Sequence, residues 1–509
     1  MRSSPKYEEM QVAATANSNG RSMIVTDDAD GSYSVWAVHV TGTFDATVNF
    51  EGTLDGTTWV PLPMIDAESS SEVLSTSSPG MFYGNVSALA LVRARISAYV
   101  SGSVTVKGQA VSTALGVRLS GGGAAAPVAT YTVTTTAPAQ THTINSLGVS
   151  ASTVVDWGDG SDNAYTGTAQ RTHVYAAAGT YTVTIDDARN VTTFDVRDNK
   201  VTLNSADIAR MVNVQTFIAI GLKAGRFDSA DVSAWRPGTF TLYSMPAGYA
   251  GTFNSADVSA WRPMNFYLFS MPAGYAGTFN SADVSAWRPV NFYLFSMPSG
   301  YAGTFDSADV SAWRPGIFYL HSMPSGYAGT FNSADVSAWR PGTFYLFFMR
   351  AGYAGTFNSA DVSAWRPTIF VLYSMPAGYA GTFNSADVSA WRPVNFYLFS
   401  MPTGYTITAG GGFASWTTGL NNFQMQGNGL LTATVNAILW ELYQAATTRT
   451  GTGGTINLGG SNQAPSGTFQ AAAACPVTVA TPGKEIAHEL INDGCGAITN
   501  HWATVTVTA

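Results

Sequence analysis

Residues 251–276 read Gly-Thr-Phe-Asn-Ser-Ala-Asp-Val-Ser-Ala-Trp-Arg-Pro-Met-Asn-Phe-Tyr-Leu-Phe-Ser-Met-Pro-Ala-Gly-Tyr-Ala, and this unit recurs with few changes. Seven copies are marked by tryptophans at a fixed spacing of 26 residues: Trp235, Trp261, Trp287, Trp313, Trp339, Trp365 and Trp391. A period of about 20–50 residues is typical of solenoids, propellers and arrays, in which each unit packs on its neighbours. We therefore expect a long regular surface, rather than one catalytic pocket, to carry the function.

Within one copy the pattern changes from helical to extended. Asn254, with an aspartate three residues later, is close to a capping box, and residues 256–261 favour one or two helical turns. Pro263 ends these turns, because the residue before a proline avoids the α region. Residues 266–271 then predict a short strand, and residues 272–277 predict a turn into the next coil. One strand and one short helix per coil is the arrangement of a leucine-rich-repeat-like solenoid.

Alternation along the strand predicts which side chains face outward. Phe266, Leu268 and Met271 should face the interior, so the residues between them should face solvent. The first outward column is Thr241, Tyr267, Tyr293, Tyr319, Tyr345, Val371 and Tyr397, and the second is Tyr243, Phe269, Phe295, His321, Phe347, Tyr373 and Phe399. The aromatic and histidine residues of both columns are the candidate partner-binding residues, because large apolar patches usually mark binding or oligomer interfaces.

Two other interpretations of these columns stay open. A register shifted by one residue would turn them into core, and a sister chain could cover them instead of a ligand. The copies differ mainly beside and on this strand, which suits recognition, although drift at exposed positions would give the same pattern.

Asp257 and Arg262 also recur in every copy and should form parallel columns. Two like charges about 4.8 Å apart repel by roughly 1 kcal/mol in water. Neighbouring Asp and Arg columns would offset that repulsion, so we interpret both as structural rather than catalytic.

Composition narrows the class of protein. The chain has 509 residues, of which 46% are hydrophobic and only 11% charged, and its 51 glycines suit β-structure with tight turns. The net charge is −8, and without a Lys/Arg cluster we expect no nucleic-acid binding. No apolar run is long enough to span a bilayer, and residues 1–9 lack the apolar core of a secretory signal.

Residues 1–118 read as a β-rich domain. Asp55-Gly56, between apparent strands at 50–54 and 57–60, is a strong hairpin signal. Residues 91–100 predict a strand with one apolar face, on which Arg93 and Arg95 should form a solvated face rather than a phosphate site. Residues 119–129, rich in Gly and Ala and containing a proline, predict a flexible linker.

Residues 130–188 predict a second β domain. Asp156-Trp-Gly-Asp-Gly-Ser161, His173-Val-Tyr175 and Gly179-Thr-Tyr-Thr-Val-Thr-Ile185 resemble a PKD-type immunoglobulin-like sandwich. The resemblance implies a binding or spacer module with Trp157 in its core. Asp156, Asp159 and His173 could suggest a metal or catalytic cluster, but the family uses these residues for turns and packing, and we prefer that interpretation.

The remaining segments frame the repeats. Residues 189–226 echo the repeat and predict an N-terminal cap, residues 227–404 hold the seven copies, and residues 405–509 predict a small α/β cap. Within this last segment, 430–443 is the best helix of the chain, 484–491 suggests another, and 455–458 and 502–507 look like closing strands. His488 and Glu489 should be ordinary surface residues. A disulfide between Cys475 and Cys495 and two free thiols are equally acceptable.

Two further resemblances bear on function. Phe253-Asn254, Ser259-Ala-Trp261 and Met271 resemble a bacterial surface family with leucine-rich-like repeats. Residues 41–59, 92–99 and 102–106 are similar to β-rich domains of tailed-phage virion proteins, which implies docking on a particle through residues 1–118.

The expected fold is therefore mainly β and multidomain: a β-sandwich, a PKD/Ig-like sandwich and a leucine-rich-repeat-like solenoid with a small cap. The expected function is that of a virion fibre, spike or decoration protein on the particle surface. It would be a homo-oligomer that binds other virion proteins and a host-surface glycan or protein. A bacterial surface adhesin is the alternative, and a glycan depolymerase is less favoured. No catalytic constellation, cofactor or metal site is expected.

Overall fold

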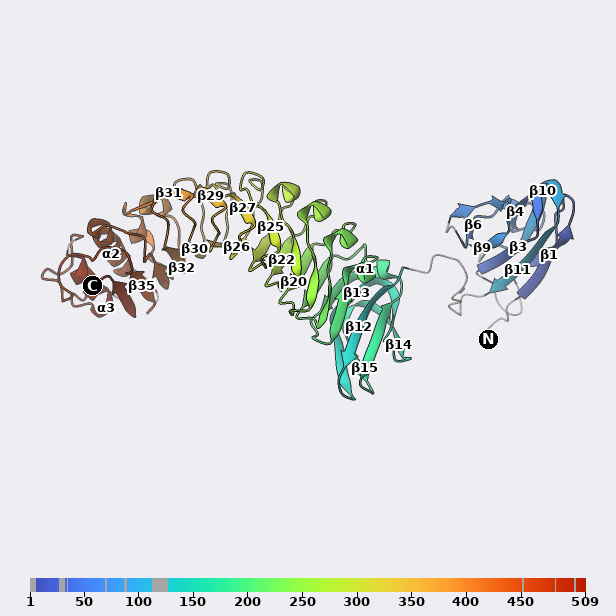
Figure 1. Ribbon diagram of the computed structural model, residues 1–509, viewed down its shortest axis with the longest axis horizontal. Helices are drawn as coiled ribbons and strands as arrows, with labels where there is room; N and C mark the ends of the chain where they lie inside the picture. The colour runs from blue at the N-terminus through green and yellow to red at the C-terminus, as the bar shows by residue number, and fades with distance from the viewer. Residues whose placement is uncertain are drawn as a thin grey trace. The chain divides into compact units, whose positions relative to one another are not determined.

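The computed structural model describes residues 6–26, 33, 35–68, 71–86, 89–111, 127–450, 453–480, 482–498 and 500–509. The chain divides into two compact units, Met1–Pro127 and Val128–Ala509. Both are built mainly of β-strands (Figure 1), which confirms the predicted fold class, including the solenoid. Most of the predicted linker at 119–129 lies outside the described residues.

The first unit packs two antiparallel sheets around one core. One sheet has the order β1 (Lys6–Ala14), β11 (Val104–Val111), β3 (Val35–Thr41), β9 (Gly80–Asn85), β6 (Met64–Asp66) and β7 (Glu72–Val73). The other has the order β2 (Ser22–Ile24), β10 (Leu91–Gly102), β4 (Phe44–Thr53) and β5 (Val60–Pro61), with β8 (Ser75–Thr76) also paired to β4. Phe50 lies between Trp36 and Phe82, with ring centroids 6.3 and 4.9 Å away.

The predicted hairpin is present, but its loop is longer than the two residues expected. Strand β4 ends at Thr53 and its partner β5 begins only at Val60, so Asp55-Gly56 lies inside a six-residue loop. The Asp55 carboxylate accepts hydrogen bonds from the backbone N–H groups of Thr57 and Thr58, which organises this longer loop instead of a two-residue turn.

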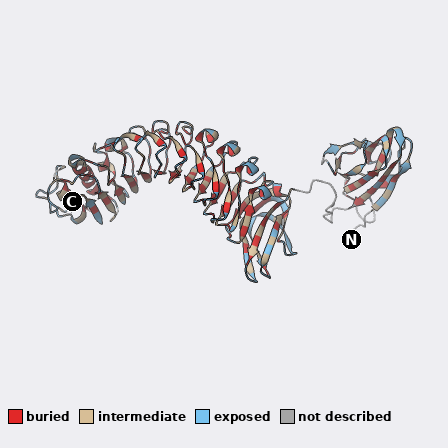
Figure 2. Cartoon of the chain, in the orientation of Figure 1, coloured by how far each residue is buried: buried red, intermediate tan, exposed pale blue. Residues whose placement is uncertain are grey.

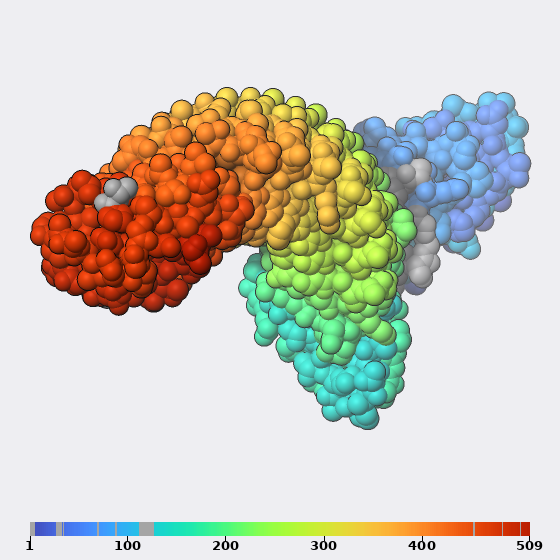
Figure 3. All heavy atoms as spheres, turned by 60° about the vertical axis from the view of Figure 1, so that its left-hand side comes forward, coloured from blue at the N-terminus to red at the C-terminus, as the bar shows by residue number. Residues whose placement is uncertain are grey.

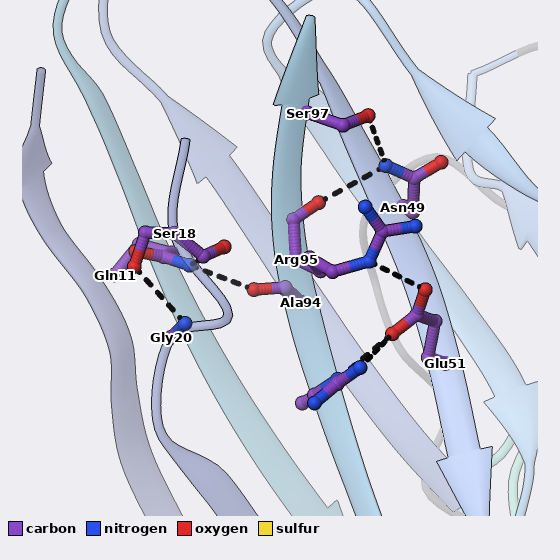
Figure 4. Close-up of polar contacts among 9 residues, drawn as sticks. Gln11, Ser18, Gly20, Asn49, Glu51, Ala94, Arg95 and Ser97 are labelled. Atoms are coloured by element: carbon purple, nitrogen blue, oxygen red, sulfur yellow. Dashed lines mark hydrogen bonds and ion pairs between the residues drawn. The ribbon is translucent and has the colours of Figure 1, made fainter. Parts of the chain in front are cut away.

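The prediction that Arg93 and Arg95 form a solvated face was wrong. Both side chains are partly buried and bind the buried Glu51 of the neighbouring strand β4, with Nε–carboxylate distances of 2.8 and 2.7 Å. Register explains the contact, because Arg93 lies directly opposite Glu51. Figure 4 shows the contact between Arg95 and Glu51. Arg93 also lies over the Trp59 ring at 4.0 Å, so these arginines are structural.

The second unit begins with an antiparallel β module, which we call the β12–β17 module. Its strands are β12 (Ala129–Thr135), β13 (Gln140–Asp156), β14 (Asp162–Tyr175), β15 (Gly179–Ile185), β16 (Val191–Val196) and β17 (Val201–Asn204). Trp157 is fully buried in its core, as predicted, and Val183 and Ile185 share the buried face of β15.

The module and the solenoid share strands. β16 pairs antiparallel with β13 and parallel with β18 (Thr216–Ile220), while β17 pairs antiparallel with β12 and parallel with β19 (Ala224–Arg226). The first coil, which includes the short helix α1 (Ser205–Ile208), is therefore built on the edge strands of the module. This pairing leaves no bare coil at the N-terminal end of the solenoid.

The repeats stack as parallel strands in unshifted register. The strands that hold the predicted outward columns are β20 (Thr239–Tyr243), β22 (Asn265–Phe269), β24 (Asn291–Phe295), β26 (Ile317–His321), β28 (Thr343–Phe347), β30 (Ile369–Tyr373) and β32 (Asn395–Phe399). Each residue pairs with the residue 26 positions later, as Phe266 does with Phe292. Buried and partly exposed residues alternate along the strands (Figure 2), with Phe266, Leu268 and Met271 inside as predicted.

Each coil also contains a second short strand where the sequence predicted only a turn. These strands are β21 (Tyr249–Thr252), β23 (Tyr275–Thr278), β25 (Tyr301–Thr304), β27 (Tyr327–Thr330), β29 (Tyr353–Thr356), β31 (Tyr379–Asn384) and β33 (Tyr405–Thr408). Gly277 has a φ of +134°, and a Cβ on it would lie 2.2 Å from the carbonyl oxygen of Phe253. Only glycine permits the two coils to approach so closely here.

The predicted helical turn is a tight turn of four residues. In four copies it is a 3-10 helix: η2 (Ser229–Val232), η3 (Ser255–Val258), η4 (Ser281–Val284) and η5 (Ser385–Val388). Asn254 occupies the cap position but makes no cap bond, and its side-chain oxygen instead accepts from the Thr278 N–H of the next coil at 3.1 Å. Of these four copies, only η5 has the cap bond, from the Ala386 N–H to Asn384.

A buried serine ties every coil to the next, and we call this contact the Ser–Asp latch. The Ser255 hydroxyl donates to the Asp283 carboxylate at 2.5 Å and accepts from the Asn280 N–H at 2.8 Å. The same bond recurs from Ser205, Ser229, Ser281, Ser307, Ser333 and Ser359 to the aspartate of the following coil. The repeat arginines, such as Arg262, bind carbonyls of their own turn. Within the described residues no ion pair joins the Asp and Arg columns.

The C-terminal cap continues this contact with a different residue. Helix α2 (Thr432–Ala446) presents Glu441, which accepts from the Ser385 hydroxyl at 3.0 Å and from the N–H groups of Gly411 and Phe413. The remaining cap elements are η6 (Gly412–Ser415), β34 (Asn422–Gln424), β35 (Thr455–Leu458), α3 (Gly483–Asn492) and β36 (Thr504–Val507). Both predicted helices and both closing strands are present.

The prediction that Glu489 is an ordinary surface residue was wrong. Its side chain is fully buried and accepts from the N–H groups of Ala472 and Cys495 at 2.9 Å. Cys495 forms a disulfide with Cys475, so Glu489 anchors one end of the bridged loop. No helix in the described part of the chain is both long enough and apolar enough for a membrane crossing.

Removing one serine hydroxyl tests the Ser–Asp latch. In Ser307→Ala, Asp335 loses its short hydrogen bond from the hydroxyl and keeps only the 3.4 Å contact from the Asn332 side-chain amide. The Asn332 N–H loses its acceptor. We expect the free energy of unfolding to fall by about 1–3 kcal/mol, measured by urea denaturation with tryptophan fluorescence. Ser311→Ala removes a hydroxyl of the same coil outside this contact and is the control. Equal urea midpoints for the two variants would contradict the role of the latch.

Candidate recognition surface

The candidate residues lie on the outer face of the long parallel sheet. Within the second unit this sheet follows the concave side of the bend, while β25, β27, β29 and β31 lie on the convex side (Figure 1). A space-filling view shows the coils as a continuous curved wall (Figure 3). The interior is instead filled by the repeat phenylalanines, leucines and tryptophans, all fully buried. The alternative in which the two outward columns form the core therefore does not hold.

The fifth residue of each strand forms an unbroken stack of seven rings, which we call the aromatic ladder. Consecutive centroids are 4.0–4.5 Å apart and the planes differ by 12–19°, along Tyr243, Phe269, Phe295, His321, Phe347, Tyr373 and Phe399. The five inner rings are covered on both faces by their neighbours. His321 is buried, and the other six ladder residues are partly exposed. The ladder thus presents mainly ring edges, which carry the positive end of the aromatic quadrupole.

The third residue of each strand forms the tyrosine column. Tyr267, Tyr293, Tyr319 and Tyr345 follow one another with centroids 4.7, 4.4 and 4.1 Å apart. Val371 interrupts the column before Tyr397, and Thr241 replaces the ring at its start. Burial raises the pKa of Tyr267, Tyr293 and Tyr319 above the ordinary value, so these hydroxyls stay protonated and can donate at neutral pH.

A polar row runs beside the tyrosine column at the first strand residue. The Asn291 side-chain amide donates to the side-chain Oδ1 of Asn265 at 2.6 Å, and the Asn265 amide donates to the Thr239 hydroxyl at 3.0 Å. The same bond joins Asn422 to Asn395 at 2.6 Å. The outer face therefore combines ring edges, phenolic hydroxyls and side-chain amides.

The bend of the solenoid is visible in the spacing of its rings. Phenylalanines of the interior column, such as Phe266 and Phe292, have centroids 5.4–5.7 Å apart. Those of the aromatic ladder are 4.0–4.5 Å apart. The coils are closer on the concave side, which compresses the outward rings into contact.

Two residues of this face were missed at the sequence level. Phe348 stands where the other six copies have serine, and Arg350 stands where they have proline. Both are exposed. Comparing the copies position by position would have found them, because the adjoining Met-x-x-Gly-Tyr pattern is otherwise unchanged.

The cluster considered in the β12–β17 module is structural in its contacts. His173 binds Asp159 at 2.7 Å and stacks on Trp157 with centroids 5.0 Å apart, and Asp156 accepts from the Gly158 N–H. Nowhere in the described ranges do three or more His, Cys, Asp or Glu side chains gather in a way that could hold a metal ion.

A second buried network in this module was not predicted. His142 is fully buried between the Tyr131 hydroxyl and the Asp198 carboxylate, each 2.9 Å away, and Lys200 binds Asp198 at 2.8 Å. A shallow hollow of about 670 Å³, lined by residues that include Asp198, Lys200 and Ile220, adjoins it. The network holds the turn between β16 and β17, the two strands that start the solenoid.

Known proteins provide little further assignment. No protein-family model matches the sequence, and no curated protein matches it at a significant level. The PBSX exported protein XepA is 21% identical with a TM-score of 0.20, over 21% of this chain and 38% of that protein. The SPBc2 prophage-derived protein YomS is 22% identical with a TM-score of 0.20, over 21% of this chain and 94% of that protein. Identities and TM-scores this low assign neither a family nor a function.

The pH dependence of stability tests the packing of His321 in the ladder. Burial lowers the pKa of His321 to about 4, whereas an unfolded histidine titrates at about 6.5. Between these values only the unfolded chain binds the proton, so stability falls as pH falls through this window and is retained above it.

We expect acidification from pH 7 to pH 4 to cost the natural chain about 3 kcal/mol more than His321→Phe. That variant places the ring that four other copies carry at this position. Urea midpoints at both pH values measure the difference. Parallel pH profiles for the two proteins would show that His321 is not desolvated.

Proposed function

We propose that the chain is a non-enzymatic virion structural protein, a fibre, spike or decoration appendage that recognises the host surface through its solenoid. The observation that carries this proposal is the aromatic face formed by the unbroken aromatic ladder and the tyrosine column beside it. Aromatic side chains are enriched in binding surfaces because they bury a large area with few rotatable bonds. Among the described elements of the second unit, no helix or second sheet is layered over this face (Figure 1).

A host-surface glycan is the partner that suits this face. A surface that repeats an outward ring in every coil favours a ligand that is itself a repeating polymer. The ring edges supply apolar contact, and the hydroxyls of Tyr293, Tyr319 and Tyr345 and the amides of Asn265 and Asn291 supply hydrogen bonds. Sugars present both kinds of surface, C–H groups and hydroxyls, and need no charge on the protein.

The same residues favour binding over cleavage. Glycoside hydrolysis usually needs a pair of carboxylates on either side of the scissile bond. Residues 238–252 and the equivalent segments of the other six copies, which include the strands of the aromatic face, contain no Asp or Glu. The repeat aspartates, such as Asp283, accept from the buried serines of the Ser–Asp latch. A depolymerase activity of this face therefore has no supporting residues.

Attachment to a particle is proposed for the first unit. It is a compact β-sandwich with its own core, and its sequence resembles β-rich domains of tailed-phage virion proteins. Detection of the chain by mass spectrometry in purified particles would support the placement. Its restriction to the bacterial envelope would favour the surface-adhesin alternative.

Recognition by the aromatic face can be tested by introducing a residue that another copy already has at the same position. Tyr293, Tyr319 and Tyr345 are replaced together by valine, the residue at the equivalent position 371. We expect binding of the full chain to host cells, and to polysaccharide extracted from them, to weaken about tenfold or more. Flow cytometry and biolayer interferometry measure the two.

The control is Ala282→Ser, an exposed position of a 3-10 turn outside this face. Unchanged binding of the triple valine variant would overturn recognition by the aromatic face. Release of reducing sugar from the polysaccharide would overturn the non-enzymatic assignment.

A further inference from the structure

One coil departs from the other six at two nearby positions. Phe348 replaces a serine present in the other copies as Ser244, Ser270, Ser296, Ser322, Ser374 and Ser400. Arg350 replaces a proline present as Pro246, Pro272, Pro298, Pro324, Pro376 and Pro402. The neighbouring residues Met349, Gly352 and Tyr353 recur in every copy. This coil therefore adds an aromatic ring and a positive charge that the other six coils lack.

The backbone gives no reason to place a phenylalanine at this position. Residue 348 has a φ of +49°, and the serines of the other copies have φ values of 50–55°. This left-handed region is uncommon for residues other than glycine, and it is least tolerated by bulky side chains. The Phe348 side chain is also 51% exposed, so it does not fill the core. Residues held in sparsely populated backbone conformations cluster at functional sites, and only this coil places a bulky aromatic side chain at the position.

The orientation of the Phe348 ring differs from that of the aromatic ladder. Its plane is turned by 66° from Phe347 and by 81° from Tyr373, with centroids 5.5 and 5.2 Å away. Both faces of Phe347 are already covered, by His321 at 4.0 Å and by Tyr373 at 4.5 Å. Phe348 must therefore lie across the edges of these rings. Its other face points away from them, toward solvent.

Arg350 adds a charge to the part of the outer face that the seven copies form. Nearer the N-terminus, Asp195 of β16 continues the line of the tyrosine column, but its charge is paired with Arg197. Arg350 is the only Asp, Glu, Lys or Arg within residues 342–356 and the equivalent segments of the other six copies. It is exposed and forms no ion pair with any described residue. Met349 between the two is buried, whereas Phe348 and Arg350 are both exposed. Their Cα atoms are at most about 7 Å apart, so one small ligand can reach both side chains.

We infer that Phe348 and Arg350 form the specificity-determining subsite of the recognition surface and select an acidic sugar. The pyranose ring lies on the open face of Phe348, and its carboxylate or phosphate group accepts hydrogen bonds from the Arg350 guanidinium. This inference rests on the proposed glycan recognition and specifies in addition that the recognised sugar carries a negative charge. An arginine fork matches either anion in geometry.

The test uses variants that restore the residues of the other copies. Phe348→Ser and Arg350→Pro should fold at least as well as the natural chain, and their urea midpoints check this. The probes are oligogalacturonate, its uncharged methyl ester, phosphomannan and neutral mannan, each titrated against the full chain by isothermal calorimetry.

We expect the natural chain to bind one acidic probe roughly tenfold to a hundredfold more tightly than its uncharged counterpart. The galacturonate and mannan pairs distinguish a carboxylate from a phosphate. Arg350→Pro should remove this preference and leave binding of the uncharged probe unchanged. Phe348→Ser should weaken both charged and uncharged probes about tenfold, because both lose the ring contact.

Equal affinity for acidic and uncharged probes, or an acidic preference that survives Arg350→Pro, would overturn the inference. If the triple valine variant still loses binding in that case, the proposed glycan recognition stands without it. Tighter binding of polyglutamate than of either acidic glycan would reassign the subsite to an acidic peptide. Absence of binding to any of these glycans and to host polysaccharide would overturn both proposals.

Discussion

The buried serine of each coil fixes the position of the next coil, and the rest of the solenoid depends on this contact. Ser255 donates to Asp283 and accepts from the Asn280 N–H, so one hydroxyl satisfies two groups of the following turn. A hydrogen bond to a charged acceptor contributes more than a neutral one. Because the contact recurs in every coil, it holds successive strands at one register. It also places a donor on each aspartate of a column whose members would otherwise repel one another.

Because the register is unshifted, each side chain lies next to the equivalent side chain of the next coil. Interior phenylalanines and tryptophans form a continuous core, and the outward rings form the aromatic ladder. The bend brings the outward rings closer together than the interior ones, which covers their faces and leaves their edges exposed. Only a ring outside the ladder, such as Phe348, can offer an open face. The register and bend of the coils therefore determine at which positions a substitution can present a new ring face to a ligand.

Both ends of the solenoid reuse the interactions of its middle. At the N-terminal end the edge strands β16 and β17 of the β12–β17 module pair with the first coil. At the C-terminal end Glu441 of helix α2 takes the place of the repeat aspartate and binds Ser385. Stacked repeats need such ends because a bare terminal coil would expose its core. The caps thus complete the same hydrogen-bonding and burial pattern with different residues.

The sequence by itself determined the period, the inward positions of Phe266, Leu268 and Met271, the burial of Trp157 and the cap helices. These features follow from spacing and local backbone preference, which a linear pattern records directly. Only the tertiary structure decided the second strand of each coil, the turn of Asn254 toward Thr278, the pairing of Arg93 and Arg95 with Glu51, and the burial of Glu489. It also decided that the outward rings stack on one another. These features depend on distances between residues far apart in the chain, and such distances are set by coil packing and sheet register rather than by neighbours in sequence.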